Sequence, residues 1–252
     1  MIFISGFDLI LKAEGRSYSS GMTDHSFVIP AYNEEKYLEE TLKAVESQNV
    51  DKEIILVDGG SNDATLEIAE RFDCQIITGI EGRGNARDVG AKQSIGEYLY
   101  FIDADTVVEE SYAKKLREFI EDNGLIAASS KFEMTGYRSK VVEVFGNQLF
   151  NCVDPVLLPG FNIAVKRQDY LESDGFKDVF GEDYQFSKAI SKQGKTGILD
   201  EKLVKTSGRR ITKYGLTGTL IYYSGKNVLR KIEMEESSVF KRHKTLKRID
   251  AG

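Results

Sequence analysis

A run of apolar and aromatic residues, Tyr98 to Ile102, stops abruptly at the acidic sequence Asp103-Ala104-Asp105. Such a continuous run is typical of a strand buried on both faces of a parallel sheet. Two carboxylates cannot lie inside that sheet without partners, so we expect them at its carboxyl end, where open α/β sheets bind ligands. There one carboxylate could hold a divalent cation and the other a ligand hydroxyl. An isolated Asp-x-Asp is also a common surface turn, so its interpretation depends on the rest of the chain.

Strand and helix patterns alternate along the chain from residue 26 onward. Short apolar runs predict strands at 27–29 (ended by Pro30), 54–57, 75–78 and 98–102. Amphipathic spacing predicts helices at 34–48, 63–72 and 85–94, and another that carries Tyr112, Leu116, Phe119 and Ile120. Because strands that alternate with helices imply βαβ units, we expect an α/β fold with a Rossmann-like, mostly parallel central sheet flanked by helices.

The second half of the chain loses this strict alternation. A strand is predicted at 125–132, a helix at 141–150, and a loop that enters a strand across 157–167. A further helix is predicted to begin near Glu182 and Asp183, because the helix dipole favours acidic residues in the first turn. These two acids therefore have a structural explanation. The alternative is that one of them is a general base that faces the first acidic cluster.

Polar residues follow several of the predicted strands. Asn33 and Glu34 follow the first strand, Asp58 follows the second, and Asp103 and Asp105 follow the fourth. Right-handed crossovers place all of these residues at one edge of the sheet. Acids and amides suit a sugar nucleotide and a metal ion better than bare polyphosphate. Bare polyphosphate would favour a Gly-x-x-x-x-Gly-Lys-Ser/Thr motif, which this sequence lacks.

Composition excludes several classes of protein. The net charge of −6 argues against a dedicated nucleic-acid-binding protein. Cys74 and Cys152 lie far apart, so neither a zinc site nor a disulfide framework is indicated, and we expect buried thiols in a reducing, cytoplasmic compartment. The sequence contains no run of 18 apolar residues, so we expect no membrane-spanning helix. The apolar start of the chain lacks the basic region of a cleavable signal.

The two ends of the chain differ from its middle. We expect a peripheral segment at 1–24, one domain at 25–210 and a helical, basic tail at 211–252. The tail carries basic residues near its end: Lys241, Arg242, Lys244, Lys247 and Arg248. They could rest on an anionic surface at the inner face of the cell membrane, or they could form a solvated end. His243 lies within this cluster, which is a poor setting for a metal ligand.

Taken in order, these motifs resemble the family 2 glycosyltransferases, which are inverting enzymes of the GT-A fold. The resemblance extends from about residue 26 to residue 210. It is carried by the order and spacing of several motifs: 28–34, 57–63, Arg83 with Ala86-Arg87, Asp103-Ala104-Asp105, 159–167 and 181–183. The resemblance implies a GT-A domain with a smaller subregion on the acceptor side.

The resemblance also implies roles on the donor side of the site. The nucleotide pocket would be lined by Pro30, Ala31, Tyr32 and Glu34. Asp58 would bind the base, and Arg83 would lie near the base or the diphosphate. Asp103, with Ala104, would contact the ribose or donor sugar. Mn²⁺ or Mg²⁺ would be held by Asp105 together with Asp103, and the basic pair Arg209-Arg210 would close over the donor phosphates. The alternative for this pair is a solvated position after a strand.

On the acceptor side, the resemblance places Gly160 and Glu182 near the acceptor and makes Asp183 the general base. A carboxylate at that position removes the proton of the acceptor hydroxyl during attack. Attack opposite the diphosphate inverts the anomeric centre in one displacement, so no protein nucleophile is needed. We expect transfer from a nucleotide-diphospho-sugar, most simply a UDP-sugar, to a glycan, lipid-linked or small-molecule acceptor.

Two positions depart from the family pattern and leave the base contacts less defined than the reaction class. Gly59 stands where many members have a second acid, and Asp88 stands where Asn is usual.

Three alternative functions have distinct requirements. A polyprenyl-phosphate acceptor would make the protein a lipid-linked sugar synthase. A sugar-phosphate nucleotidyltransferase would need a Gly-rich loop with Arg and Lys after the first strand, where this chain has Pro30-Ala31-Tyr32-Asn33-Glu34. A sugar-nucleotide-binding module without activity would have no use for a general base at Asp183.

Overall fold

The computed structural model describes residues 23–136, 139–150, 156–179 and 181–209. Nearly all of the expected peripheral segment lies outside these described residues. The expected basic tail also lies outside them, together with Cys152, Arg210 and His243. The expected domain boundaries at 1–24, 25–210 and 211–252 therefore stay predictions.

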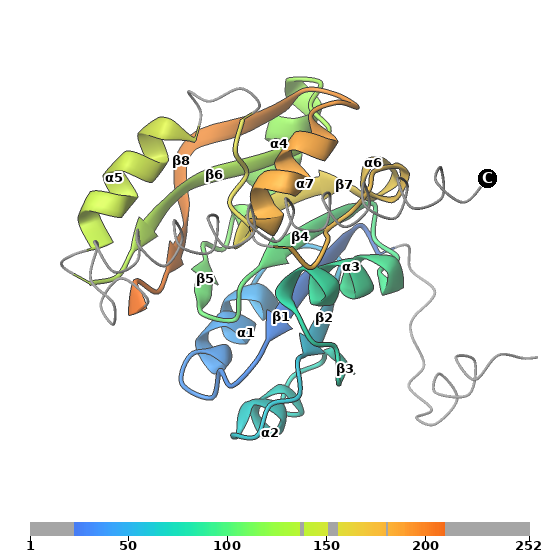
Figure 1. Ribbon diagram of the computed structural model, residues 1–252, viewed down its shortest axis with the longest axis vertical. Helices are drawn as coiled ribbons and strands as arrows, with labels where there is room; N and C mark the ends of the chain where they lie inside the picture. Colours follow the sequence, from blue (N-terminus) through green and yellow to red (C-terminus); the bar gives the residue numbers. More distant parts are fainter. Residues whose placement is uncertain (1–22, 137–138, 151–155, 180, 210–252) are drawn as a thin grey trace, which may run out of the picture.

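The strands in the described part of the chain form a single eight-stranded sheet in the order β3-β2-β1-β4-β7-β6-β8-β5 (Figure 1). They are β1 (His25–Ala31), β2 (Lys52–Asp58), β3 (Gln75–Ile77), β4 (Tyr98–Ile102), β5 (Thr106–Val108), β6 (Ala127–Met134), β7 (Asn162–Lys166) and β8 (Thr196–Thr206). The helices are α1 (Leu38–Glu46), α2 (Thr65–Ala69), α3 (Arg83–Gln93), α4 (Tyr112–Asp122), α5 (Ser139–Leu149), α6 (Arg167–Glu172) and α7 (Glu182–Ile190).

The first half of the sheet is parallel, as the alternating pattern predicts. At its centre, Val28 of β1 pairs with Ile55 of β2 on one side and with Phe101 of β4 on the other. Strand β7 then pairs antiparallel with both β4 and β6, and β8 runs parallel to β6. The predicted α/β class with a mostly parallel sheet is confirmed.

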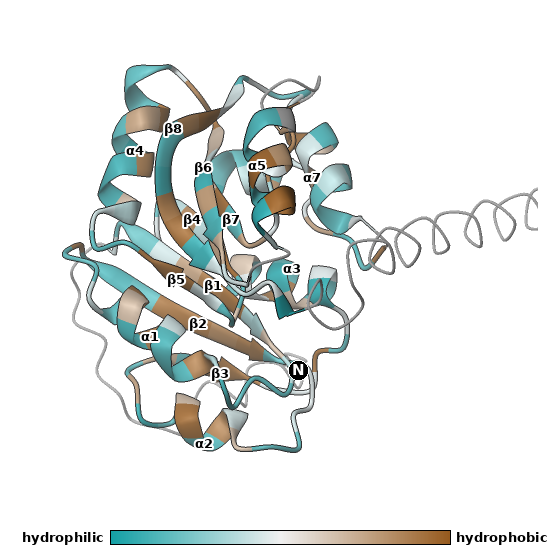
Figure 2. Cartoon of the chain, turned by 90° about the vertical axis from the view of Figure 1, so that its left-hand side faces the viewer, coloured by the Kyte–Doolittle hydropathy of each residue, from teal (hydrophilic) through white to brown (hydrophobic). Residues whose placement is uncertain are grey.

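Helices cover both faces of this sheet (Figures 1 and 2). On one face, side chains such as Phe27 and Tyr100 pack with α1, α2 and α4, for example with Leu42. On the other face, Phe101 packs with α3, α6 and α7, for example with Phe186. Because β4 is buried on both sides throughout its length, its carboxyl end is the first place where its acidic continuation reaches solvent.

Three predicted boundaries near the site are wrong, each for a local reason. Strand β1 does not stop at Pro30: its ladder to β4 ends at Val28, so the missing amide hydrogen of Pro30 breaks no bond there, and the strand continues beside β2. Helix α1 begins at Leu38 rather than residue 34, because the amides of Tyr37 and Leu38 bond the carbonyl of Glu34 in a turn, both at 3.0 Å.

Helix α3 begins at Arg83, two residues before the predicted start. The preceding residue, Gly82, has φ of 87° and lets the chain turn directly into the helix. Strand β5 and helix α6 were not predicted, because they follow β4 and β7 so closely that they show no separate sequence pattern. The early start of α3 matters for the site, because it puts Arg83 and Arg87 one turn apart on the same helical face.

Candidate functional site

A cleft of about 420 Å³ opens at the carboxyl ends of β1, β2 and β4. Most of the residues predicted for the donor side line it: Pro30, Ala31, Tyr32, Glu34, Arg83, Asp103, Ala104, Asp105 and Arg209. Gly59, Ile80, Glu81, Gly82 and Ala86 complete the lining. The fold therefore brings together residues from the first strand to the end of the last one.

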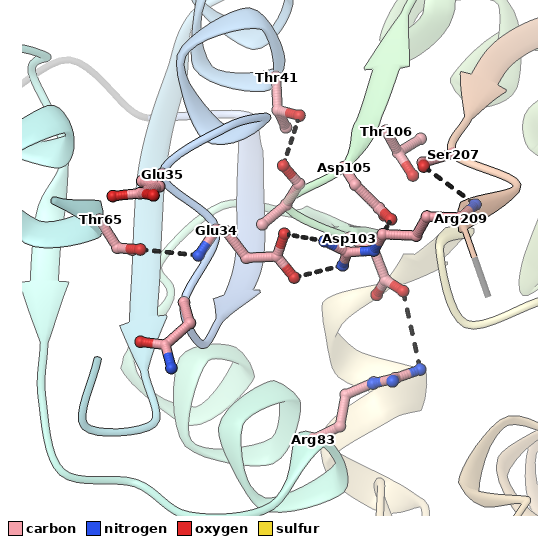
Figure 3. A network of polar contacts seen from close by, with 12 residues as sticks. Glu34, Glu35, Thr41, Thr65, Arg83, Asp103, Asp105, Thr106, Ser207 and Arg209 are labelled. Carbon is pink, nitrogen blue, oxygen red and sulfur yellow. Dashed lines mark hydrogen bonds and ion pairs between the residues drawn. The ribbon is translucent and has the colours of Figure 1, made fainter. Parts of the chain in front are cut away.

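Backbone hydrogen bonds hold the acidic turn that follows β4 (Figure 3). The amide of Thr106 bonds the carbonyl of Asp103 at 3.0 Å, and the amide of Ser207 bonds the carbonyl of Asp105 at 3.2 Å. From the other side, the buried hydroxyl of Thr41 in α1 donates to the carbonyl of Ala104 at 2.9 Å. Because the main chain is anchored at all three residues, both carboxylates project from a fixed turn.

Arg209 joins two of the acids in this cleft (Figure 3). Its Nη1 lies 2.6 Å from Oε2 of Glu34, its Nη2 contacts the other oxygen of that carboxylate, and its Nε lies 3.1 Å from Oδ2 of Asp105. The guanidinium also lies over the ring of Tyr37, 4.9 Å from its centre. Its hydrogen bonds to Glu34 raise the pKa of Arg209, so this group is always cationic.

Two arginines of α3 connect Asp103 to Glu182, which was predicted to lie near the acceptor. The buried Arg87 places Nη2 at 2.6 Å from Asp103 and Nη1 at 3.1 Å from Glu182. Arg83, one turn earlier, lies 3.8 Å from each of the same two carboxylates and is partly exposed to the cleft. These contacts connect the first turn of α7 to Asp103 on the lining of the cleft.

Asp183 lies next to Glu182 in the first turn of α7, and the backbone amide of Tyr184 donates to its Oδ1 at 2.8 Å. Burial raises the pKa of the Asp183 carboxyl, and the nearby charge of Glu182 raises it further. Arg87 and the amides of Tyr184 and Gly160 act in the opposite direction. A carboxylate with a raised pKa is a stronger proton acceptor, which suits a general base.

Asp58 lies behind the cleft rather than on its lining. It is fully buried, and its carboxylate accepts hydrogen bonds from the amides of Gly60 and Ser61 at 2.8 and 2.9 Å and from the Ser61 hydroxyl. Its neighbour Gly59 reaches the lining instead. The carboxylate therefore shapes the turn after β2, and the predicted contact between Asp58 and a base stays a prediction.

Sequence reasoning assigned no site role to Arg87. The residue belongs to a predicted motif, but its burial between two carboxylates could not be foreseen from that motif. The available signal was the spacing of Arg83 and Arg87, since side chains four residues apart share a helical face. That signal became readable only once the helix was known to begin at Arg83.

The acids of the cleft fit a hard divalent cation in part. Within the described ranges, no group of three His, Cys, Asp or Glu side chains could hold a metal ion by itself. Asp103 and Asp105 nevertheless line one cleft and offer oxygen ligands, and Mg²⁺ is often held by one or two carboxylates together with substrate phosphates. The residues therefore fit an ion whose remaining ligands would come from substrate phosphates.

No helix in the described residues is long and apolar enough to cross a membrane.

The fold and the cleft define a protein of the GT-A class. Residues 26–145 match the family model for glycosyl transferase family 2. Two curated relatives are similar to a part of the chain. Staphylococcus aureus poly(ribitol-phosphate) beta-N-acetylglucosaminyltransferase TarS is 33% identical over 112 residues, which are 40% of this chain and 20% of TarS. Staphylococcus epidermidis poly-beta-1,6-N-acetyl-D-glucosamine synthase is 34% identical over 111 residues, covering 41% and 27%.

Solved structures share the fold across more of the chain. S. aureus TarS in complex with UDP-GlcNAc has a TM-score of 0.61 at 22% identity and covers 74% of this chain and 59% of that one. Mannosyltransferase PcManGT from Pyrobaculum calidifontis, in complex with GDP-Man and Mn²⁺, has a TM-score of 0.61 at 18% identity, covering 83% and 65%. This chain is thus similar to glycosyl transferase family 2 over residues 26–145, and its described part has the GT-A fold. It spans about a fifth of the length of TarS.

Proposed function

We propose that this protein is an inverting glycosyltransferase that moves a sugar from a nucleotide-diphospho-sugar to an acceptor hydroxyl. The observation that carries the proposal is one cleft in which the carboxylates of Glu34, Asp103 and Asp105 face the guanidinium groups of Arg83 and Arg209. A diphosphate ester needs cationic groups for its oxygens and a carboxylate for its metal ion. The family match supports this function over a nucleotidyltransferase.

Each residue of the donor side has a physical task in this proposal. Arg83 and Arg209 bind diphosphate oxygens, because a planar guanidinium matches the geometry of a phosphate. Asp105, with Asp103, would hold Mn²⁺ or Mg²⁺. When bound, that ion would neutralise the charge that develops on the leaving diphosphate. Tyr32 lies exposed on the cleft lining, where its ring offers a surface for the base.

On the acceptor side, Asp183 accepts the proton of the attacking hydroxyl. Its raised pKa makes it a better proton acceptor than an exposed aspartate, and the contacts of Arg87 connect its segment to Asp103. The new glycosidic bond forms as the bond to the diphosphate breaks, and the diphosphate leaves with the bonding electrons. Because the attack is direct, the sugar is transferred with inversion.

The first donor to test is UDP-N-acetylglucosamine. TarS was crystallised with UDP-GlcNAc, and both curated relatives above carry N-acetylglucosamine in their names. PcManGT was crystallised with GDP-Man, so GDP-mannose is the matched alternative. The acceptor is proposed by class alone, as the hydroxyl of a glycan, lipid-linked or small-molecule acceptor. The alternative of a polyprenyl phosphate rests on residues 211–252, which lie outside the described part of the chain.

Calorimetric titration of nucleotide sugars with and without Mn²⁺ tests the donor half of the proposal. Binding should require the metal and should weaken at least about tenfold in Asp105→Ala, since a charged ligand interaction is lost. Asp122→Ala, at an exposed position near the end of α4, is the matched control and should bind like the wild type. Equal binding with and without metal would contradict the metal-dependent mechanism.

The Asp183→Asn variant tests the catalytic half. It should bind Mn²⁺ and UDP nearly as the wild type does, while release of UDP from UDP-N-acetylglucosamine in the presence of acceptor falls by roughly 10²-fold or more. Transfer at the wild-type rate would show that Asp183 is not the base.

A further inference from the structure

Arg87 is unusual among the lysine and arginine residues in the described part of the chain because its side chain is buried. Only 1% of it is exposed, and its guanidinium lies 5.2 Å from the centre of the ring of Phe176, which packs with Phe101 and Phe186. Burying a guanidinium is costly unless carboxylates compensate it. The Nε atom of Arg87 is buried without a hydrogen-bond partner, so the position of the guanidinium leaves one of its donors unsatisfied. Its position instead follows the two acids that it joins.

Those two acids come from elements far apart in the chain. Asp103 directly follows β4, and Glu182 opens α7. Nη2 of Arg87 lies 2.6 Å from Oδ1 of Asp103, and Nη1 lies 3.1 Å from Oε1 of Glu182. A planar guanidinium fixes the angle between two such contacts, whereas an ammonium acts as a point charge. The side chain therefore links Asp103 to the helix that carries Asp183.

Gly160 provides the space for this arrangement. A Cβ at this position would lie 2.8 Å from Nη2 and 2.9 Å from Cζ of Arg87, closer than a side-chain carbon can approach without displacing the guanidinium. The amide of Gly160 also lies close enough to the Asp183 carboxylate to lower its pKa. Gly160 is thus close to both the guanidinium and the expected base, and an added carbon there would displace the guanidinium.

Arg83 and Arg87 approach the same two acids from different environments. Arg83 is 37% exposed, lies 3.8 Å from each carboxylate and lines the cleft, where a donor can reach it. Arg87 makes the shorter contacts and does not line the cleft. Arg83 can therefore contact a ligand in the cleft, whereas Arg87 contacts only other groups of the protein.

We propose that Arg87 is a positioning residue that holds Asp103 next to the Glu182–Asp183 turn. Its guanidinium occupies space that is free because Gly160 has no side chain. This inference rests on the proposed function, since it assigns Arg87 the task of holding the acceptor-side base in register with the donor. It adds a residue that touches neither donor nor acceptor.

A thermal double-mutant cycle tests the geometry without any ligand. Gly160→Ala should lower the melting temperature by several degrees in the wild-type background, because its methyl group meets the guanidinium. In an Arg87→Met background, Gly160→Ala should lower the melting temperature by at most about a third as much, because the flexible thioether side chain can move away from the added methyl group. If Arg87→Met does not fold, Arg87→Lys serves as the second background. An equal decrease in melting temperature in both backgrounds would contradict the proposal that the Arg87 guanidinium needs the space at Gly160.

The catalytic role is tested by Arg87→Lys, which keeps the charge and removes the planar fork. We expect UDP release from UDP-N-acetylglucosamine, with Mn²⁺ and acceptor, to fall by about 10²-fold, as small misplacements of reacting groups do. The dissociation constant of UDP with Mn²⁺ should change by less than about fivefold, because the residue does not line the cleft. Arg71→Lys, an exposed arginine paired with Glu39, is the matched control and should change neither quantity.

The outcomes separate this inference from the proposed function. If the wild type binds no nucleotide with Mn²⁺, the proposed function is wrong and the positioning role is wrong with it. If the wild type binds and turns over donor and Arg87→Lys matches it within about threefold, the positioning role alone is wrong. If affinity and rate fall by the same factor, Arg87 contributes only to donor binding, and the inference is overturned.

Discussion

The two terminal nitrogens of the Arg209 guanidinium donate hydrogen bonds to the two carboxylate oxygens of Glu34, although 175 positions separate these residues in the sequence. Arg209 follows the end of β8, and Glu34 lies in the turn after β1. This contact closes one side of the cleft, and the further contact to Asp105 links it to the acidic turn. The cleft is therefore lined by both ends of the described domain.

The first prediction concerns Arg209→Lys. A lysine keeps the charge but cannot contact both carboxylate oxygens and a diphosphate through one planar fork. We expect the affinity for UDP with Mn²⁺, measured by calorimetry, to fall roughly 10- to 100-fold, the range for charge-assisted hydrogen bonds. Lys205→Arg, at an exposed position on β8, is the control. An unchanged dissociation constant would mean that Arg209 serves only the contact with Glu34.

The second prediction separates stability from activity at Asp183. Because its pKa is raised in the folded protein, the native state holds this proton more tightly than the unfolded chain does. Stability is therefore greatest below the ordinary pKa of aspartate and declines as pH rises through the folded value. Asp183→Asn should raise the melting temperature at pH 7 by one to a few degrees, roughly, and the gain should vanish near pH 3. A lower melting temperature at pH 7 would contradict the raised pKa.

The third prediction concerns Glu143, which attaches α5 to the sheet. Its buried carboxylate receives hydrogen bonds from Lys202, Lys140 and the amide of Met134 at 2.6, 2.8 and 2.9 Å. Burial opposes ionisation, but these bonds outweigh it and lower the pKa of Glu143 to about 2. The stability that they supply is complete above the ordinary glutamate pKa and is lost as pH falls toward about 2.

Accordingly, Glu143→Gln should reduce the free energy of unfolding at pH 7 by on the order of 2 kcal/mol, and by much less near pH 2. Denaturant titrations at both pH values measure the difference. Glu118→Gln, at an exposed position on α4, provides the comparison. A loss of equal size at both pH values would show that ionisation of Glu143 contributes nothing.

The fourth prediction concerns Thr41, whose hydroxyl anchors Ala104 between the two aspartates. Thr41→Val keeps the shape of the buried side chain and removes the bond, leaving the carbonyl of Ala104 without this donor. We expect a loss of about 1 kcal/mol in stability and a several-fold weaker affinity for Mn²⁺ with UDP, because the acidic turn is less well held. Chemical denaturation and calorimetry give the two numbers. Full retention of affinity would show that the backbone bonds of Thr106 and Ser207 suffice.

Much of the parallel half of the fold could be predicted from the chain alone. The apolar run of Tyr98–Ile102 is long enough and continuous enough to require burial on both faces, and β4 has exactly those bounds. Its acidic continuation, together with Glu34 after the first strand, located the edge of the sheet where the cleft lies. These inferences succeed because burial and strand direction act on neighbouring residues.

In the second half, strands β6 and β7 and helices α5 and α7 lie close to their predicted positions, but no bounds were predicted for strand β8. Strand β8 is half-exposed at its start and exposed in its middle, so no regular apolar alternation marks it. Its place between β6 and β5 brings Arg209 to Glu34, and local patterns do not encode strand order. Arg87 was missed in the same way, because the chain pattern shows an arginine on a helix and not the two carboxylates that enclose it.

The sequence by itself determined that β1, β2 and β4 are buried and which acids follow them, since these features depend on local hydrophobic pattern and turn chemistry. Only the tertiary structure decided which cation meets which acid. Pairings such as Arg87 with Glu182 join segments 95 residues apart. Such contacts are set by the packing of whole elements, which minimises uncompensated buried charge, and they leave no periodic trace in the chain.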